Sequence, residues 1–302
     1  MRHNGSHCIC RFLRVRSLQA VKATLGPILI FHSKVWDCQT GECICTLQHA
    51  HIVRAVAFPP INKPLLIATG GFEKKLRIYD ISQYKRDDGP SGTTRNTTNG
   101  VANGSNGSNN TSPTSPNSLD GITKSVTDSG SFEVGDGTHK GTIKSIIWLA
   151  KDILVTAADD NKIRWFDIRS RSLLKEYDLA GPIGSCEIDS EGAIISVAAG
   201  KTAFFFSGSV PGELVKSVDT PHDLASVALH KEKRQFVVGG TSDTYVRIYN
   251  YDSGKELDLQ RGHHGPVWTV GITPDGKMYG TGSEDGTIKL WKFTQEPYGL
   301  WR

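Results

Sequence analysis

Residues 262–291 read GHHGPVWTVGITPDGKMYGTGSEDGTIKLW, and this stretch decides the fold. Three short runs of apolar and small residues lie within it, at 267–272, 278–283 and 287–291. The turn formers Pro274-Asp275-Gly276 and Glu284-Asp285-Gly286 separate these runs. Proline fixes φ, aspartate bonds back to the main chain and glycine permits positive φ, so each separator predicts a chain reversal. The stretch therefore predicts three antiparallel strands joined by tight turns.

A glycine-histidine pair at the start of this stretch and a tryptophan at its end mark it as a WD repeat, the unit of a β-propeller blade. In WD-repeat proteins such a blade resembles a sheet held by a buried polar clasp. The resemblance implies that Asp285 accepts hydrogen bonds from His263 and nearby backbone. The histidine then meets a Ser or Thr hydroxyl, which meets the indole of Trp291, and Ser283 is the hydroxyl that we expect. A fully paired buried network of this kind selects one strand register.

The same residue types also make up a catalytic Ser-His-Asp set, which is the competing interpretation. It is disfavoured because these residues recur at blade spacing and no nucleophile turn such as G-x-S-x-G accompanies them. The sequence also lacks a metal-ligand cluster, a phosphate-binding loop and a nucleophile motif. We therefore expect no catalytic residues, no cofactor, no bound metal and no small-molecule substrate.

The pattern recurs upstream at one period. Four of the five spacings between successive strand-closing aromatic residues are 39–44 residues, close to the length of a WD repeat, and the other is 87. The aromatic positions are Trp36, Tyr79, Phe166, Phe205, Tyr249 and Trp291. The sequence predicts an all-β WD-repeat β-propeller with about five complete blades and a partial one. Such a repeat is informative about fold and says little about chemistry.

Each repeat carries some of the other blade markers. A histidine precedes the first strand at His49, His139 and His263, whereas the two middle units have Leu179 and Thr220 at that place. Acidic residues occupy the predicted hairpins at Glu73, Asp160, Asp243 and Asp285. Trp36 and Asp37 close the partial unit.

Two segments interrupt the pattern. From about residue 85 to residue 131 the chain is rich in Ser, Thr, Asn, Gly and Pro. Such composition cannot bury enough apolar surface to offset its ordering entropy, so we expect a disordered insertion between the third and fourth strands of one blade. It explains the doubled spacing. Residues 34–302, this insertion apart, are assigned to the propeller.

Residues 1–33 carry five basic residues and no acidic one, and they show no Gly-His start. We predict that they lie outside the propeller. A mitochondrial transit peptide is one explanation of an Arg-rich, acid-free start, and a truncated or mis-joined coding sequence is the explanation that we favour.

Composition narrows the classes of function further. The net charge of +4 is too small to indicate a nucleic-acid surface by itself. No run of about 18 apolar residues is present, so no membrane span is expected. The six cysteines lack disulfide and zinc-ligand spacing, so we expect free thiols in a reducing compartment. They are Cys8, Cys10, Cys38, Cys43, Cys45 and Cys186.

The chain from about Lys34 to Trp301 resembles the WD-repeat family of serine/threonine kinase receptor-associated (Unr-interacting) proteins. The resemblance rests on residues 249–257, on 262–267, on 282–287 and on the tail Tyr298-Gly299-Leu300-Trp301. It implies a seven-bladed, non-catalytic scaffold of the cytoplasm, also present in the nucleus. Its implied partners are components of the survival-of-motor-neuron complex, which assembles Sm proteins on spliceosomal RNA. The chain departs from the family by lacking about two N-terminal blades and an acidic tail, and by its insertion.

Two alternatives of function remain open. One is a component like subunit i of translation initiation factor three, a related seven-bladed scaffold. The other is direct RNA binding through a basic face. The candidate cations are Lys74, Lys75, Arg77, Lys140, Lys144, Lys162 and Arg164. The competing interpretation is that these cations form a solvated charged rim, and it is favoured because no single-strand-binding motif is present.

Overall fold

The computed structural model describes residues 21–25, 31–36, 41, 43–59, 66–82, 125–126, 130–149, 152–189, 191 and 193–293. For 21–25, 31 and 125–126 it describes the backbone alone. The predictions for residues 1–20, Asp37, most of the insertion and the tail 298–301 lie outside the described residues.

The described strands form six sheets. The first contains β1 (Val21–Leu25), β2 (Phe31–Trp36), β3 (Cys43–His49) and β7 (Ser125–Val126). The second contains β4 (Val53–Ala57), β5 (Leu66–Gly71), β6 (Leu76–Asp80) and β8 (Ser131–Val134). The third contains β9 (Ile143–Trp148), β10 (Ile153–Ala158), β11 (Lys162–Asp167) and β12 (Ser172–Asp178).

The remaining three sheets follow in the same order. The fourth contains β13 (Ile183–Ile188), β14 (Ile194–Ala199), β15 (Thr202–Ser207) and β16 (Leu214–Asp219). The fifth contains β17 (Leu224–His230), β18 (Gln235–Gly240), β19 (Val246–Asn250) and β20 (Glu256–Gln260). The sixth contains β21 (Val267–Ile272), β22 (Met278–Ser283) and β23 (Ile288–Lys292).

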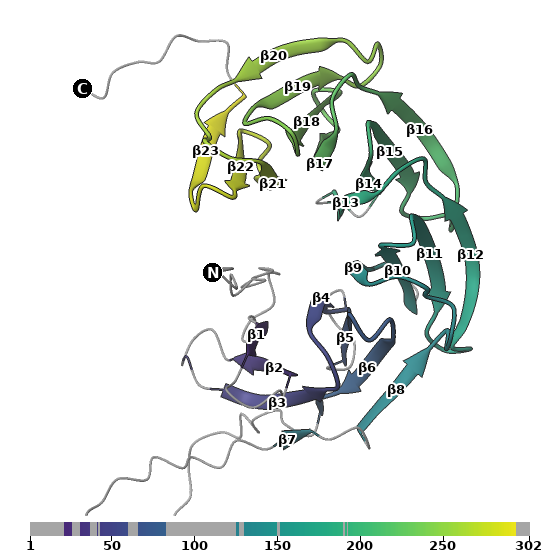
Figure 1. Ribbon diagram of the computed structural model, residues 1–302. Coiled ribbons are helices and arrows are strands. Elements are labelled where there is room, and N and C mark those ends of the chain that lie inside the picture. The colour runs from purple at the N-terminus through teal and green to yellow at the C-terminus, as the bar shows by residue number, and fades with distance from the viewer. Residues whose placement is uncertain are drawn as a thin grey trace, which may run out of the picture.

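The six sheets stand side by side in an open arc around a common centre (Figure 1). Strands β4, β9, β13, β17 and β21 face the centre, and β12, β16 and β20 lie on the outer rim (Figure 1). The opening of the arc lies between the sixth sheet and the first (Figure 1). The predicted all-β propeller is confirmed. Its five periodic units correspond to the first three strands of the second to sixth sheets, and the partial unit that closes at Trp36 corresponds to the end of β2.

The core lies between neighbouring blades. Val155 and Trp165 of the third blade pack against Val197 and Phe206 of the fourth, and all four side chains are buried. The same contact recurs one blade further on, where Phe205 packs against Phe236. Burial of apolar area stabilises by about 25 cal/mol per Å², so each blade depends on the neighbour at each face. The outermost strand β12 has no such cover and is mostly exposed.

A β-bulge recurs near the start of each innermost strand of the second to sixth blades. The register with the next strand shifts between Val267 and Thr269, and equivalent shifts occur in the other four. A bulge bends its strand and increases the local right-handed twist. The five innermost strands therefore enter their blades with the same bend, as a propeller requires.

The structure corrects the prediction for residues 1–33. Val21–Leu25 pairs in antiparallel register with Phe31–Trp36, so part of this segment belongs to the first sheet. The glycine-histidine marker failed as a guide here because it precedes a first strand, and the described part of this sheet begins with a strand equivalent to the second.

The insertion follows β6 and precedes β8, which places it between the third and fourth strands of the second blade. Its end is more ordered than composition predicts. Ser125–Val126 pairs in parallel with Thr46 and Leu47 of the first blade, and β8 begins at Ser131. Pairing with a neighbouring strand edge supplies the order that composition could not reveal.

Candidate functional site: blade clasps and an interblade pocket

The sixth blade contains a continuous chain of hydrogen bonds from its hairpin to its third strand. His263 Nδ1 lies 3.1 Å from Asp285 Oδ2, and His263 Nε2 lies 2.7 Å from the hydroxyl of Thr281. The indole N–H of Trp291 donates to the same hydroxyl at 2.8 Å. Because a carboxylate only accepts, Nδ1 carries the proton, and Thr281 donates to Nε2. Thr281 is 1% exposed and His263 is 4% exposed, so the centre of the network is buried, whereas Asp285 and Trp291 are half-buried at its ends.

The structure corrects one member of the predicted clasp. Ser283 does not join the chain, because its hydroxyl donates to the carbonyl of Gly265 at 2.9 Å and accepts from Asp285 N at 3.3 Å. Thr281 and Ser283 lie two residues apart on β22, so both point to the same face of the sheet. Their positions along the strand differ. Thr281 lies beside the indole of Trp291, and Ser283 lies at the hairpin.

Asp285 holds the hairpin itself. It accepts from the backbone N–H of His264 at 2.8 Å and from both the N–H and the hydroxyl of Thr287, at 2.8 and 2.7 Å. The Thr287 hydroxyl and these backbone donors lower the pKa of Asp285 well below its ordinary value. The residue is a fixed acceptor and does not act as an acid.

The third blade keeps half of this clasp. His139 Nε2 lies 2.8 Å from the hydroxyl of Thr156, but Phe166 at the closing position has no N–H to continue the chain. Asp160 receives the backbone N–H of Lys140 at 3.0 Å and two bonds from the guanidinium of Arg164, at 3.0 and 2.7 Å.

Arg164 replaces the missing part of the clasp. It is 1% exposed, and its Nε donates to Glu176 at 2.8 Å, so one guanidinium joins the hairpin to the outermost strand β12. Arg77 with Glu73 and Arg247 with Asp243 repeat this pair, at 2.9 and 2.7 Å. An arginine four residues after a hairpin acid is the sequence signal that was missed.

Hydroxyl and histidine occur together across the blades. Position four of the second strand is Thr69, Thr156 or Thr281 in the three blades that have the clasp histidine. In the two blades without it the position is Val197 or Val238, both buried in apolar clusters. In the third and sixth blades this hydroxyl is bonded to the histidine. A buried hydroxyl without a partner is costly, so loss of the histidine goes with loss of the hydroxyl.

The remaining predicted markers have separate roles. His49 ends β3 of the first blade, and its Nδ1 lies 3.4 Å from the hydroxyl of Tyr79 in the second blade. The carboxylate of Glu73 accepts from the backbone N–H of His51 at 3.1 Å. Lys34 lies over the ring of Trp36, 5.8 Å from its centroid. Cys45 and Cys186 are buried free thiols, and Cys43 is a half-buried one.

Most of the cations proposed to face RNA are held by carboxylates. Lys75 pairs with Glu133 at 2.8 Å, Lys144 with Asp159 at 2.7 Å, and Lys162 with Glu176 and Asp178. The prediction that Arg164 faces RNA is wrong, because a side chain that is 1% exposed cannot contact a nucleic acid. Lys74 remains exposed in a turn with φ of 60°. Pairing and burial therefore account for four of the five cations in the candidate set of Lys74, Lys75, Lys144, Lys162 and Arg164.

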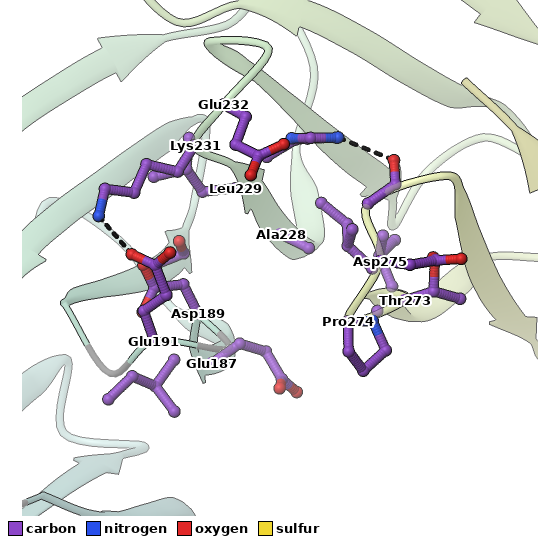
Figure 2. A pocket seen from close by; sticks show the side chains of 17 residues that line it. Glu187, Asp189, Glu191, Ala228, Leu229, Lys231, Glu232, Thr273, Pro274 and Asp275 are labelled. Atoms are coloured by element: carbon purple, nitrogen blue, oxygen red, sulfur yellow. Dashed lines mark hydrogen bonds and ion pairs between the residues drawn. The ribbon is translucent and has the colours of Figure 1, made fainter. Parts of the chain in front are cut away.

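A pocket of about 350 Å³ lies among the fourth, fifth and sixth blades. The turns that join the first and second strands of these blades surround it. In Figure 2, Glu187, Asp189 and Glu191 lie on one side, Thr273, Pro274 and Asp275 on the other, and Leu229, Lys231 and Glu232 between them. Lys231 pairs with Glu191 of the fourth blade, and His230 Nε2 lies 2.8 Å from the carbonyl of Gly276 of the sixth. The middle turn therefore links both neighbours.

The comparisons with known proteins agree with this architecture. The model of the WD domain, G-beta repeat, matches residues 41–80 and 254–292. Both matches begin near a fourth strand and end in the third strand of the next blade. The chain is a WD-repeat β-propeller protein.

Over most of its length it is similar to the serine-threonine kinase receptor-associated proteins, which confirms the resemblance seen in the sequence. The chicken (Gallus gallus) protein is 33% identical over 274 residues, 90% of this chain and 64% of that protein. The Dictyostelium discoideum protein of the same name is 28% identical over 292 residues, 96% of this chain and 81% of that protein. The chain thus spans a little under two thirds of the length of the chicken relative.

The similarity to the alternative family, subunit i of translation initiation factor three, is weaker. The eukaryotic translation initiation factor 3 subunit I of Culex quinquefasciatus is 27% identical over 171 residues, 52% of each chain. Within the described blades, no group of three or more His, Cys, Asp or Glu side chains is arranged to hold a metal ion. The same part of the chain contains no helix of the length and apolarity that a membrane crossing needs.

Replacing Thr281 with Val removes the hydroxyl that both His263 and Trp291 use. We expect β22 and β23 to lose about 1–3 kcal/mol of opening free energy, because two buried groups are left unpaired. Native-state hydrogen exchange of these strands measures the effect locally. Ser283→Ala is the matched control and should cost less. A larger loss for Ser283→Ala would restore the serine to the clasp.

Arg164→Ala should destabilise the third blade by about 3–5 kcal/mol, because it leaves the carboxylates of Asp160 and Glu176 without their buried partner. Arg169→Ala is the control: Arg169 also pairs with an aspartate, Asp152, but is 81% exposed, so the loss should be under about 1 kcal/mol. Denaturant unfolding of both variants tests this, and equal losses would contradict the structural role of Arg164.

The pKa of His139 falls from 6.5 to about 4, chiefly because burial disfavours its charged form and then because Arg164 lies near. The unfolded chain therefore takes up a proton between pH 6.5 and pH 4 that the folded chain refuses. Stability contributed by the neutral ring is complete above pH 6.5 and declines as pH falls, by about 1.4 kcal/mol per pH unit.

His139→Gln should flatten this decline in unfolding free energy measured from pH 7 to pH 4. His264→Gln replaces an exposed histidine and should leave the decline unchanged. The same slope in both variants would show that His139 is not the group responsible.

Proposed function

We propose that the chain is a non-catalytic scaffold that holds protein complexes together. The observation that carries the proposal is similarity over 90% of the chain to the chicken serine-threonine kinase receptor-associated protein. Two features of the described blades support it. His263 and Asp285, which resemble members of a catalytic set, are used in the clasp of the sixth blade, and the turns at the blade ends are exposed around a pocket. Propellers bind partners through such turns and rims.

For the partners, we propose components of Sm-protein assembly, as the family resemblance implies, and hence a part in pre-mRNA splicing. Serine-threonine kinase receptors, which the name of the relatives suggests, are the second class of partner to test. The proposed location is the cytoplasm, and the nucleus as well. Direct RNA binding is disfavoured because Lys75, Lys144 and Lys162 are paired with carboxylates.

The test is affinity purification of the tagged chain from its own cells, with proteins identified by mass spectrometry. We expect Sm-assembly components to be enriched over a tagged propeller of unrelated sequence. Enrichment of initiation-factor subunits alone would replace this assignment with the alternative, and no enriched protein at all would contradict the scaffold role.

A further inference from the structure

The pocket among the fourth, fifth and sixth blades has a charge opposite to that of the chain as a whole. The chain carries a net charge of +4, yet five carboxylates line the pocket against one lysine, Lys231. The carboxylates belong to Glu187, Asp189, Glu191, Glu232 and Asp275. They come from three blades that are separate in sequence, so the negative charge gathers here only because the blades stack side by side.

The internal contacts use only part of this charge. Glu191 pairs with Lys231, and Asp275 accepts from the hydroxyl of Thr273 at 2.6 Å and from Lys277 N at 3.1 Å. Asp189 uses Oδ1 to accept from Ala193 N at 2.7 Å, whereas its Oδ2 is buried with no hydrogen-bond donor in the described structure.

A second unpaired polar group lies in the same cavity. Ser196 lines the pocket and is 2% exposed, and its hydroxyl has no side-chain or backbone partner among the described residues. Buried hydroxyls and carboxylate oxygens normally have partners, so two unpaired groups at one cavity indicate an external donor.

The floor of the pocket is apolar. Ala228 and Val270 are buried there, and Leu229, Ile188 and Ile272 are half-buried around them. An apolar floor beneath an acidic wall suits a long side chain that ends in a cation, since lysine and arginine pack their stems on apolar surface and keep the charged end at polar groups. A volume of about 350 Å³ is in the range of ligand pockets.

A metal ion does not fit the same acids. A divalent cation needs several oxygens converging on one point, and no three acidic or histidine side chains of the described residues converge in that way. The charges are spread around the cavity, which suits the spaced cations of a peptide.

We propose that this pocket binds a basic peptide segment of a partner protein, with one arginine or lysine inserted between Asp189 and Ser196. This rests on the proposed scaffold function and assigns it a site. Guanidinium is the better fit, because its several N–H groups can serve both the unpaired carboxylate oxygen and the hydroxyl. Glu232, exposed at the edge, adds attraction for neighbouring cations.

The experiment measures binding of the full 302-residue chain to a fluorescein-labelled 12-residue peptide of alternating Arg and Ser. The matched control peptide has citrulline in place of arginine, which keeps the shape and removes the charge. We expect the arginine peptide to bind at least ten-fold more tightly than the citrulline peptide, with an affinity that weakens as salt is raised. Equal binding of the two peptides would overturn the proposal.

Two variants assign that binding to the pocket. Glu187→Gln, Asp189→Asn and Glu232→Gln together should weaken it at least ten-fold. A control that neutralises the exposed acids Glu213, Asp223 and Asp258 in the same way should leave it within two-fold. Equal effects in the two triple variants would show general attraction and contradict the site.

A single substitution tests the cavity without removing any native group. Gly271 lines the pocket, has no positive φ, and a Cβ built on it meets no atom within 4 Å. Gly271→Lys should therefore fold and place its own ammonium among the carboxylates, abolishing peptide binding, whereas Gly271→Ser should keep it. Thermal unfolding of each variant checks the fold, and undiminished binding to Gly271→Lys would overturn the proposal.

The scaffold function and the pocket can fail separately. If affinity purification with Gly271→Lys recovers the same partners in the same amounts as the unchanged chain, the scaffold role stands and the pocket is refuted as their site.

Discussion

Each sheet of this protein has two apolar faces and can bury them only against the sheets beside it. Trp165 and Phe206 meet across one such boundary, and Phe205 and Phe236 meet across the next. This constraint explains why the repeats share a period, a bulge and an apolar pattern while their polar residues vary. Each apolar layer is shared by two neighbouring blades. A change in the apolar pattern of one blade would therefore also disrupt the packing of the blades beside it.

The polar residues act within blades. Where histidine, threonine and tryptophan are all present, as in the sixth blade, a chain of neutral hydrogen bonds joins the strands. Where the tryptophan is absent, an arginine paired with the hairpin acid joins them, as Arg164 does. Blades with neither histidine nor hydroxyl place valine at the same point. The blades thus use three arrangements at equivalent positions: a hydrogen-bonded hydroxyl, an arginine paired with an acid, or an apolar side chain. Each avoids the cost of a buried hydroxyl without a partner at that position.

These structural uses of charge account for the contrast between the two candidate surfaces. Three of the candidate lysines, Lys75, Lys144 and Lys162, are paired with acids, which disfavours a basic face for RNA. Carboxylates from three successive turns gather at one cavity, where Asp189 keeps an unpaired oxygen. The net charge of the whole chain predicts neither the candidate basic surface nor the acidic pocket. The local charge at each place depends on which groups are paired and where they lie.

The sequence by itself determined the all-β class, the period of the blades, the hairpin positions and the place of the insertion. These follow from local properties: turn residues reverse the chain and alternation sets the buried face. It could not choose between Thr281 and Ser283, since a period of two puts both on one face and only depth in the packed blade distinguishes them. The sequence did not predict β1 or β7, because these strands form through pairing with a neighbouring strand. The pocket was decided by tertiary structure alone, because its walls come from turns more than forty residues apart that only the stacking of blades brings together.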